Sequence, residues 1–331
     1  MMNELIRLFK VIILIFCLVL VLAGATLMLR YNPKAFETVT IAEPEKPKLW
    51  EAPDIKTLSK DKEDERILYG RELISHTSDY LGPNGSVMKI SNGMNCQNCH
   101  LEAGTKPFGN NFGSVASTYP KFRARSGGFE SIEKRVNDCL ERSLNGNATL
   151  DSLSKEMVGI VSYIKWLGKD VSKESKAAGS GFVEMVWLNR PADPAAGKKL
   201  YMMKCQICHG NSGEGQRISA NSRFIYPPLW GENSFTTAAG LFRISNFSKY
   251  IVANMPNGAT YDSPLLKEEE AWDIAAFVLT MPRPDKKFSQ DWPKIETKPV
   301  DHPFGPYADN FSEQQHKFGP FKEILEMKNE K

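Results

Sequence analysis

The chain has 331 residues and a formal net charge of +3, and 24% of its residues are charged. When the apolar N-terminal segment is left out, the remaining length suits two domains of ordinary size. The net charge is small and no basic tract is interleaved with aromatic residues, which argues against a protein that binds nucleic acid. We therefore expect no nucleic-acid partner.

The sequence begins with a pattern typical of exported proteins. An uncharged apolar run, Val11–Leu29, follows two basic residues, Arg7 and Lys10. The run is as long as a membrane-spanning helix, roughly 17–25 residues, and Ala23-Gly24-Ala25 within it resembles a signal-peptidase site. We predict that residues 1–30 are a signal peptide or a membrane anchor. The rest of the chain is then periplasmic, either soluble after cleavage or anchored to the inner membrane.

Four of the six cysteines fall into two copies of the pattern C-x-x-C-H, CQNCH at 96–100 and CQICH at 205–209. In this pattern two thiols attach a haem covalently and the histidine binds its iron. A redox dithiol would need a βαβ context, and a zinc site would need a second cysteine or histidine pair at finger-like spacing. The sequence shows neither, so it predicts two covalently attached c-type haems. The attachment residues are Cys96, Cys99, Cys205 and Cys208, and the proximal iron ligands are His100 and His209.

Each motif is followed by an amphipathic helix that would close a cytochrome c fold. Apolar residues recur at helical spacing in SKEMVGIVSYIKWLGK after the first motif and in EEEAWDIAAFVLTM after the second. We predict an all-α protein with two cytochrome c-type domains joined by a linker. Its predicted parts are a signal or anchor helix (1–30), an extended tether (31–61), domain 1 (62–168), a linker (169–190), domain 2 (191–285) and a C-terminal strap or solvated tail (286–331).

The second iron has one clear candidate for its distal ligand. Met255, in the turn NMPNG, is the only methionine between His209 and the closing helix. A methionine elsewhere would more often fill a gap in the core. Its position and the lack of rivals favour a thioether ligand here, which would raise the potential of that haem.

The first domain offers no methionine and no second histidine between His100 and Ser154. A buried, inert cysteine is the common fate of an unpaired thiol. A thiolate bound to iron would explain better why Cys139 stands beside arginines, and it would lower the potential of that haem. The possible distal ligands are Cys139, Lys106, Lys121 and Lys134, or the site is open.

Arginines are grouped around this cysteine. Residues three or four apart share one face of a helix, so Arg135, Cys139 and Ser143 are expected to cluster. Arginines on a helix usually form a solvated face, but around an iron-bound sulfur they indicate an anion site, because guanidinium groups bind oxyanions through paired hydrogen bonds. The candidate substrate-site residues are Cys139, Ser143, Arg123, Arg125, Arg135 and Arg142.

From about Glu65 to Pro293 the sequence resembles the dihaem thiosulfate dehydrogenases, also called tetrathionate reductases. The resemblance rests on GMNCQNCHLEAGT, FRARSGG, RVNDCLERSLNG, YPPLWG and NMPNG, of which the cysteine-centred motif is the specific one. It places the family's arginine and serine near the ligand cysteine at Arg125 and Ser143. Some relatives carry a lysine before the distal methionine, where this chain has Asn254, which argues against lysine exchange at that haem.

The resemblance implies a catalytic haem held by His100 and Cys139, and an electron-transfer haem held by His209 and Met255. The implied reaction joins two thiosulfates into tetrathionate, reversibly, with two electrons passing to an external electron-carrier cytochrome or a similar redox partner. Two other functions make different demands on these residues. A non-enzymatic carrier of the c4 type would have methionine at both distal positions, and a dihaem peroxidase would need an open iron site.

Overall fold

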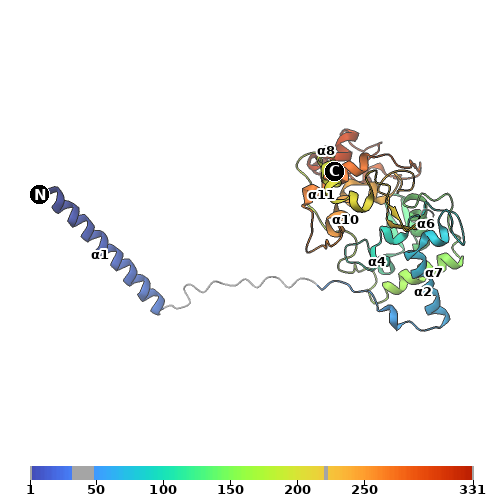
Figure 1. Ribbon diagram of the computed structural model, residues 1–331, viewed down its shortest axis with the longest axis horizontal. Helices are drawn as coiled ribbons and strands as arrows, with labels where there is room; N and C mark the ends of the chain where they lie inside the picture. The colour runs from blue at the N-terminus through green and yellow to red at the C-terminus, as the bar shows by residue number, and fades with distance from the viewer. Residues whose placement is uncertain (1, 32–47, 220–222, 330–331) are drawn as a thin grey trace. The chain divides into compact units, whose positions relative to one another are not determined.

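The computed structural model describes residues 2–31, 48–219 and 223–329 (Figure 1). The chain divides into two compact units, residues 1–47 and 48–331. Most of the predicted tether, residues 32–47, lies outside the described residues. Its remaining part, from Lys48, belongs to the second unit, where the Trp50 amide donates a hydrogen bond to the Ala178 carbonyl (3.0 Å).

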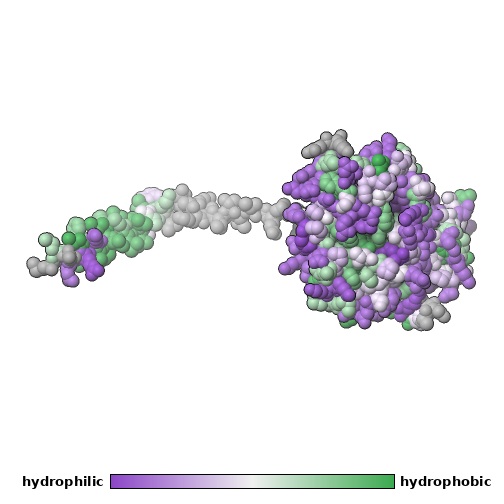
Figure 2. Space-filling model, turned by 90° about the horizontal axis from the view of Figure 1, so that it is seen from above, coloured by the Kyte–Doolittle hydropathy of each residue, from purple (hydrophilic) through white to green (hydrophobic). Residues whose placement is uncertain are grey.

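The described part of the first unit is one helix, α1 (Met2–Tyr31). Its segment Glu4–Met28 is long and apolar enough to cross a membrane, and its residues are exposed. Figure 2 shows hydrophobic side chains along the visible face of this helix. An exposed apolar helix at this position fits a signal peptide and a membrane anchor equally, as expected from the sequence.

The first cytochrome c domain is built on two crossing helices, α2 (Lys62–Ser75) and α7 (Lys155–Leu167), which lie side by side (Figure 1). Their backbones meet at two glycines. A Cβ atom on Gly70 would lie 1.9 Å from the carbonyl oxygen of Gly159, so a larger residue would separate the helices. The predicted apolar face of α7 is buried in the domain core at Met157, Ile160, Val161, Ile164 and Leu167.

The remaining elements of this domain are short. Strands β1 and β2 pair antiparallel, with Arg123 opposite Gly128. The elements are α3 (Thr77–Leu81), η3 (Cys96–Asn98), α4 (Leu101–Gly104), α5 (Val115–Thr118), β1 (Lys121–Arg123), β2 (Gly128–Glu130) and α6 (Ile132–Arg142).

The second cytochrome c domain repeats the same plan. Helix α8 (Pro194–Lys204) crosses α11 (Glu268–Thr280), and a Cβ atom on Gly197 would lie 1.8 Å from the Asp273 carbonyl oxygen. Thus the first and last helices of each domain cross at a glycine. The predicted all-α class with two cytochrome c-type domains is confirmed, and the described residues add only two short two-stranded sheets to it. The other elements are α9 (Gln206–His209), β3 (Gln216–Arg217), β4 (Phe224–Tyr226), η4 (Gly240–Phe242) and α10 (Ile244–Asn254).

Helix α10 connects the two domains through hydrogen bonds. The Tyr250 hydroxyl donates to the carbonyl of Asn98, inside the first C-x-x-C-H motif (3.1 Å). Asn254 donates from Nδ2 to the Phe108 carbonyl (3.1 Å). Since Met255 follows directly after α10, the same helix contacts the first haem motif and leads into the predicted distal ligand of the second haem.

The C-terminal residues pack against the two domains. After η5 (Ile295–Thr297), helices α12 (Glu313–Phe318) and α13 (Lys322–Asn329) complete the chain. Phe321 is fully buried, and its ring lies against Trp187 and Trp272 with centroid distances of 4.9 and 5.8 Å. Before these helices, residues 286–293 return to the first domain, where they contact the end of α6.

Candidate functional site

The first C-x-x-C-H motif is fixed by hydrogen bonds from its own domain. The Cys96 amide donates to the Thr77 hydroxyl (2.9 Å), and the Asn95 amide donates to Asn98 Oδ1 (2.7 Å). His100 Nδ1 lies 2.6 Å from the Asn110 carbonyl, which can only accept, so Nδ1 carries the hydrogen. The other ring nitrogen, Nε2, is therefore left with a lone pair for a metal, as in other histidine ligands.

Helix α6 places Cys139 opposite this histidine. Ser131 caps the helix by accepting from the Lys134 amide, and Ile132 and Leu140 anchor it in the core. The Cys139 thiol is close enough to His100 for a side-chain hydrogen bond. A cavity of about 410 Å³ is lined by Cys96, Cys99, His100, Cys139 and Ser143, among others.

These residues fit a c-type haem. The two thiols and the imidazole of the first C-x-x-C-H motif share a cavity with one more sulfur donor, the Cys139 thiol. Sulfur and imidazole are the usual axial ligands of haem iron. The predicted alternatives Lys106, Lys121 and Lys134 are not among the described residues that line the cavity. Lys134 instead binds Asp138 (2.5 Å). Of the candidate distal ligands, the structure brings only Cys139 to His100.

The surroundings of Cys139 favour its thiolate. Burial raises the pKa of this thiol, but the adjacent Arg135 guanidinium, the neighbouring His100 ring and the charge of Arg125 together lower it to about 7. The effect is mutual, since Cys139 is the main cause that raises the pKa of Arg135. A thiolate is the form of cysteine that binds metals and attacks sulfur.

The second motif is held in the same way. His209 Nδ1 lies 2.8 Å from the Pro227 carbonyl, and burial lowers the pKa of this histidine, which favours the neutral ring that a metal needs. Met255 follows α10 and packs half-buried against the core. Cys205, Cys208 and His209 fit a second c-type haem. The role of Met255 stays a prediction.

We expect Met255→Gly to remove the methionine–iron charge-transfer band and to lower one of the two haem potentials, because a thioether ligand raises the potential. The spectrum of the thiolate-ligated haem should be unchanged, which serves as the internal control. Absorbance and potentiometric titration of the purified protein measure both. A band that survives the substitution would show that another residue binds the second iron.

The six residues predicted for the substrate site separate into two groups. Cys139 and Ser143 line the cavity together with Arg123, Arg125 and Arg135. Arg142 does not line it. Its guanidinium instead forms two hydrogen bonds to Asp291 (2.6 and 2.8 Å) and lies 3.7 Å from the centre of the Phe288 ring.

The three arginines of the cavity differ in how far they are already paired. Arg125 forms an ion pair with Asp138 (3.3 Å). In the described part of the chain, no acceptor binds the guanidinium of Arg123 or Arg135. Arg123 and Arg135 therefore have the most hydrogen-bonding capacity to offer an anion, and of the two Arg135 acts more strongly on Cys139.

Several lining residues were not predicted from the sequence, among them Arg243, Asn246 and Trp292. Arg243 and Asn246 come from the start of α10 in the second domain, and Trp292 comes from the C-terminal segment. Arg243 is partly neutralised by the buried Asp301 (Nη2 to Oδ1, 2.5 Å). No local motif marks these residues, because they reach the cavity only through the packing of the two domains.

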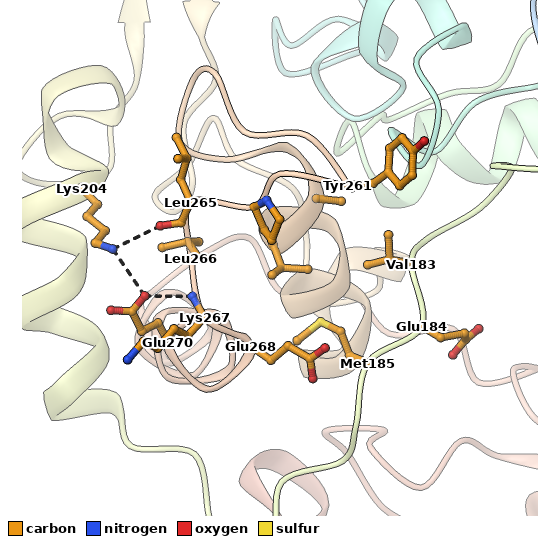
Figure 3. A pocket seen from close by; sticks show the side chains of 13 residues that line it. Val183, Glu184, Met185, Lys204, Tyr261, Leu265, Leu266, Lys267, Glu268 and Glu270 are labelled. Carbon is orange, nitrogen blue, oxygen red and sulfur yellow. Dashed lines mark hydrogen bonds and ion pairs between the residues drawn. The ribbon is translucent and has the colours of Figure 1, made fainter. Parts of the chain in front are cut away.

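A second hollow of about 590 Å³ lies on the second domain, between α8, α10 and the start of α11 (Figure 3). Among the described residues, those lining it include no cysteine and no histidine. Its charged groups are largely engaged already. Lys204 binds Glu270 (3.4 Å), Glu184 binds Lys249 (2.7 Å), and Glu268 accepts from the Val186 amide (3.2 Å). We assign no chemistry to this hollow.

The sequence of each haem domain matches a known family of cytochrome c domains. Residues 87–172 match the SoxA/TsdA cytochrome c domain, and residues 194–282 match the cytochrome c family. The thiosulfate dehydrogenase of Psychrobacter arcticus is 36% identical over 244 residues, which cover 73% of this chain and 71% of that protein. That of Allochromatium vinosum is 39% identical over 225 residues, covering 66% and 79%.

A solved structure is also similar. The thiosulfate dehydrogenase TsdBA from Marichromatium purpuratum, in its as-isolated form, superposes with a TM-score of 0.66 at 26% identity. The match covers 75% of this chain and 52% of that one, so this chain spans about half the length of the solved chain. Because this chain covers 71% and 79% of relatives that are 36% and 39% identical to it, and the two matched cytochrome c domains contain both haem motifs, the chain belongs to the thiosulfate dehydrogenase family of dihaem c-type cytochromes.

Proposed function

We propose that the protein is an oxidoreductase that joins two thiosulfate ions into tetrathionate, and catalyses the reverse reaction, in the cavity of the first domain. The observation that carries this proposal is the placement of Cys139, whose thiol faces His100 while Arg135 lies beside it. The reaction balances as two thiosulfate dianions giving one tetrathionate dianion and two electrons. When bound, the two haems can take up or supply one electron each.

The arginines would bind the substrates. Thiosulfate is a dianion, and two of them must approach each other before a sulfur–sulfur bond can form. Arg123 and Arg135 have unused donors, and Arg125 adds positive charge from the loop before β2. Guanidinium groups can bind the sulfonate oxygens through paired hydrogen bonds and reduce the repulsion between the ions.

Cys139 would react with sulfur directly. A thiolate attacks a sulfur–sulfur bond and forms a mixed species while the other half leaves. In the reducing direction, the Cys139 thiolate and tetrathionate give a cysteine carrying one thiosulfate unit and one free thiosulfate, so charge and atoms balance. The second thiosulfate is released when two electrons restore the thiolate. Ser143, one turn along α6, lines the cavity where its hydroxyl can donate to a sulfonate oxygen.

The electrons would leave through the second haem domain to an external electron carrier, a cytochrome or a similar redox protein. This transfer would take place in the periplasm, where α1 would have acted as an export signal or would still anchor the protein to the inner membrane. The hydrogen bond from the Tyr250 hydroxyl to the Asn98 carbonyl of the first haem motif supports direct electron transfer between the two domains.

Steady-state assays in both directions test this function. Thiosulfate with an electron acceptor should yield tetrathionate, and tetrathionate with an electron donor should yield thiosulfate. Mass spectrometry should show two haems on the mature chain in the same preparation. A fully loaded protein without either activity, and with two methionine-ligated haems in its spectra, would instead be a c4-like electron carrier.

We expect Arg135→Ala to lower kcat/KM for thiosulfate roughly tenfold or more, because a hydrogen bond to a charged group contributes about 1.5–3 kcal/mol. Lys165→Ala is the matched control, since it removes an exposed positive charge of the same domain outside the cavity. Assays at low and high thiosulfate separate binding from turnover. Equal kcat/KM for Arg135→Ala and the control would exclude Arg135 from anion binding.

A further inference from the structure

The C-terminal segment 286–293, here called the strap, holds the end of the helix that carries Cys139. Lys286 Nζ donates to the carbonyls of Glu141 (3.1 Å) and Gly146 (2.5 Å), which lie at and just beyond the last turn of α6. Five residues later, Asp291 forms the two hydrogen bonds to the buried Arg142. The strap is therefore fixed to the first domain, although it follows the second domain in sequence.

Trp292 extends from this fixed strap into the wall of the cavity. Its amide donates to the Arg125 carbonyl (2.7 Å), and its ring packs edge-on against His302 with a centroid distance of 5.7 Å. The side chain lines the cavity beside Arg123 and Arg125. No acceptor in the described ranges binds its indole N–H, which remains available to a ligand.

The backbone of Trp292 is unusual for a large residue. Its φ angle is +61°, in the left-handed region that non-glycine residues seldom adopt. Such a conformation persists only where the surrounding contacts impose it, and it is frequent at ligand sites. Here the contacts are the Arg125 hydrogen bond and the Asp291 ion pair, and together they point the indole at the cavity.

We propose that Trp292 is a specificity-determining residue, whose indole limits the length of the sulfur chain that can reach Cys139. This inference rests on the proposed function. The polythionates share two sulfonate ends and differ in the number of sulfur atoms between them. The arginines can bind the ends of any member, so charge alone does not select among them. A large ring held at the cavity wall by the strap selects by length, because a longer chain would overlap the ring.

Two adjacent glycines provide a way to move the strap without altering a side chain of the cavity. Gly127 has φ +68°, and a Cβ atom on it would lie 2.6 Å from Cγ of Pro293, the residue after Trp292. A Cβ atom on Gly128 would meet nothing within 4 Å. Gly127→Ala should therefore displace Pro293 and Trp292, while Gly128→Ala is its matched control.

The experiment compares tetrathionate with hexathionate as electron acceptors for the fully loaded protein. Reduction of either takes two electrons and breaks one sulfur–sulfur bond, which yields two dianions. The readout is the ratio of kcat/KM for hexathionate to that for tetrathionate. This ratio does not depend on the fraction of protein that is folded or loaded with haem.

We expect Trp292→Ala to raise this ratio about tenfold or more, as for other changes that enlarge a substrate pocket. Gly127→Ala should raise the ratio in the same direction, whereas Trp292→Phe and Gly128→Ala should stay close to the wild type. If Trp292→Ala does not accumulate with two haems, Trp292→Leu replaces it, because leucine also removes the aromatic wall, which phenylalanine partly keeps.

The outcomes separate this inference from the proposed function. A wild-type protein that does not reduce tetrathionate overturns the proposed function. A wild-type protein that does, with the same ratio in Trp292→Ala or Trp292→Leu, overturns only the role of Trp292. A ratio that rises equally in Gly127→Ala and Gly128→Ala would also count against the role of Trp292, since only Gly127→Ala displaces the strap.

Discussion

Replacing Cys139 by glycine should abolish nearly all turnover in both directions while leaving two covalent haems on the chain. Attachment uses the thiols of the two C-x-x-C-H motifs, so it does not depend on Cys139. The substitution removes the sulfur that would carry a thiosulfate unit, and a nucleophile that acts as part of a catalytic unit can contribute several orders of magnitude to kcat. The electron paramagnetic resonance signal of a thiolate-ligated haem should also disappear.

A second substitution separates the two roles of this residue. Cys139→Met should restore a six-coordinate first haem with a higher potential, because a thioether donates less electron density than a thiolate. It should have little activity, since a thioether cannot form a mixed disulfide-like species with substrate sulfur. Wild-type rates of tetrathionate formation in Cys139→Met would leave Cys139 as an iron ligand that sets the potential and does not react.

Removing Asp291 should destabilise the protein by about 3–5 kcal/mol, the usual cost of leaving one partner of a buried ion pair unpaired. The side chain of Arg142 is only 6% exposed and that of Asp291 18%. Asp291→Ala leaves the Arg142 charge without its two hydrogen bonds and frees the strap from α6. The midpoint of guanidinium unfolding, followed by circular dichroism, measures this loss.

Two further variants test whether the Arg142–Asp291 ion pair is the cause of this loss of stability. Lys287→Ala breaks an exposed ion pair with Asp285 in the same strap and should change stability by less than about 0.5 kcal/mol. The double variant Arg142→Met/Asp291→Leu should recover much of the loss, because an apolar pair can replace a buried ion pair at little cost. If Asp291→Ala unfolds at the same denaturant concentration as Lys287→Ala, the ion pair does not stabilise the strap.

Much of this protein follows from local sequence. A C-x-x-C-H motif contains both attachment thiols and the proximal histidine within five residues, so no distant part of the chain is needed to recognise a haem site. The helical spacing of apolar residues likewise identifies α7 and α11, because the side that faces the core must be continuous. Cys139 could be selected as a distal ligand because few side chains in that stretch can bind iron at all.

The arginines show where sequence reasoning stops. Helical spacing groups Arg135 with Cys139 and Ser143, and all three line the cavity. The same spacing also predicts Arg142 in this group, although Arg142 does not line the cavity. Arg142 is instead held by Asp291, which lies 149 positions away in sequence. Spacing describes the faces of one helix, whereas the partner that covers each face is chosen by contacts between distant segments.

The far wall of the cavity depends on tertiary structure alone. Arg243 and Asn246 reach it because the second domain packs on the first, and Trp292 reaches it because the strap returns to α6. No local pattern marks any of them, since their roles arise from long-range ion pairs and hydrogen bonds. The sequence by itself thus determined the two haem motifs, the helices and the candidate distal sulfur of Cys139. The tertiary structure decided which cations and which ring surround that sulfur, because only folding brings those side chains into one cavity.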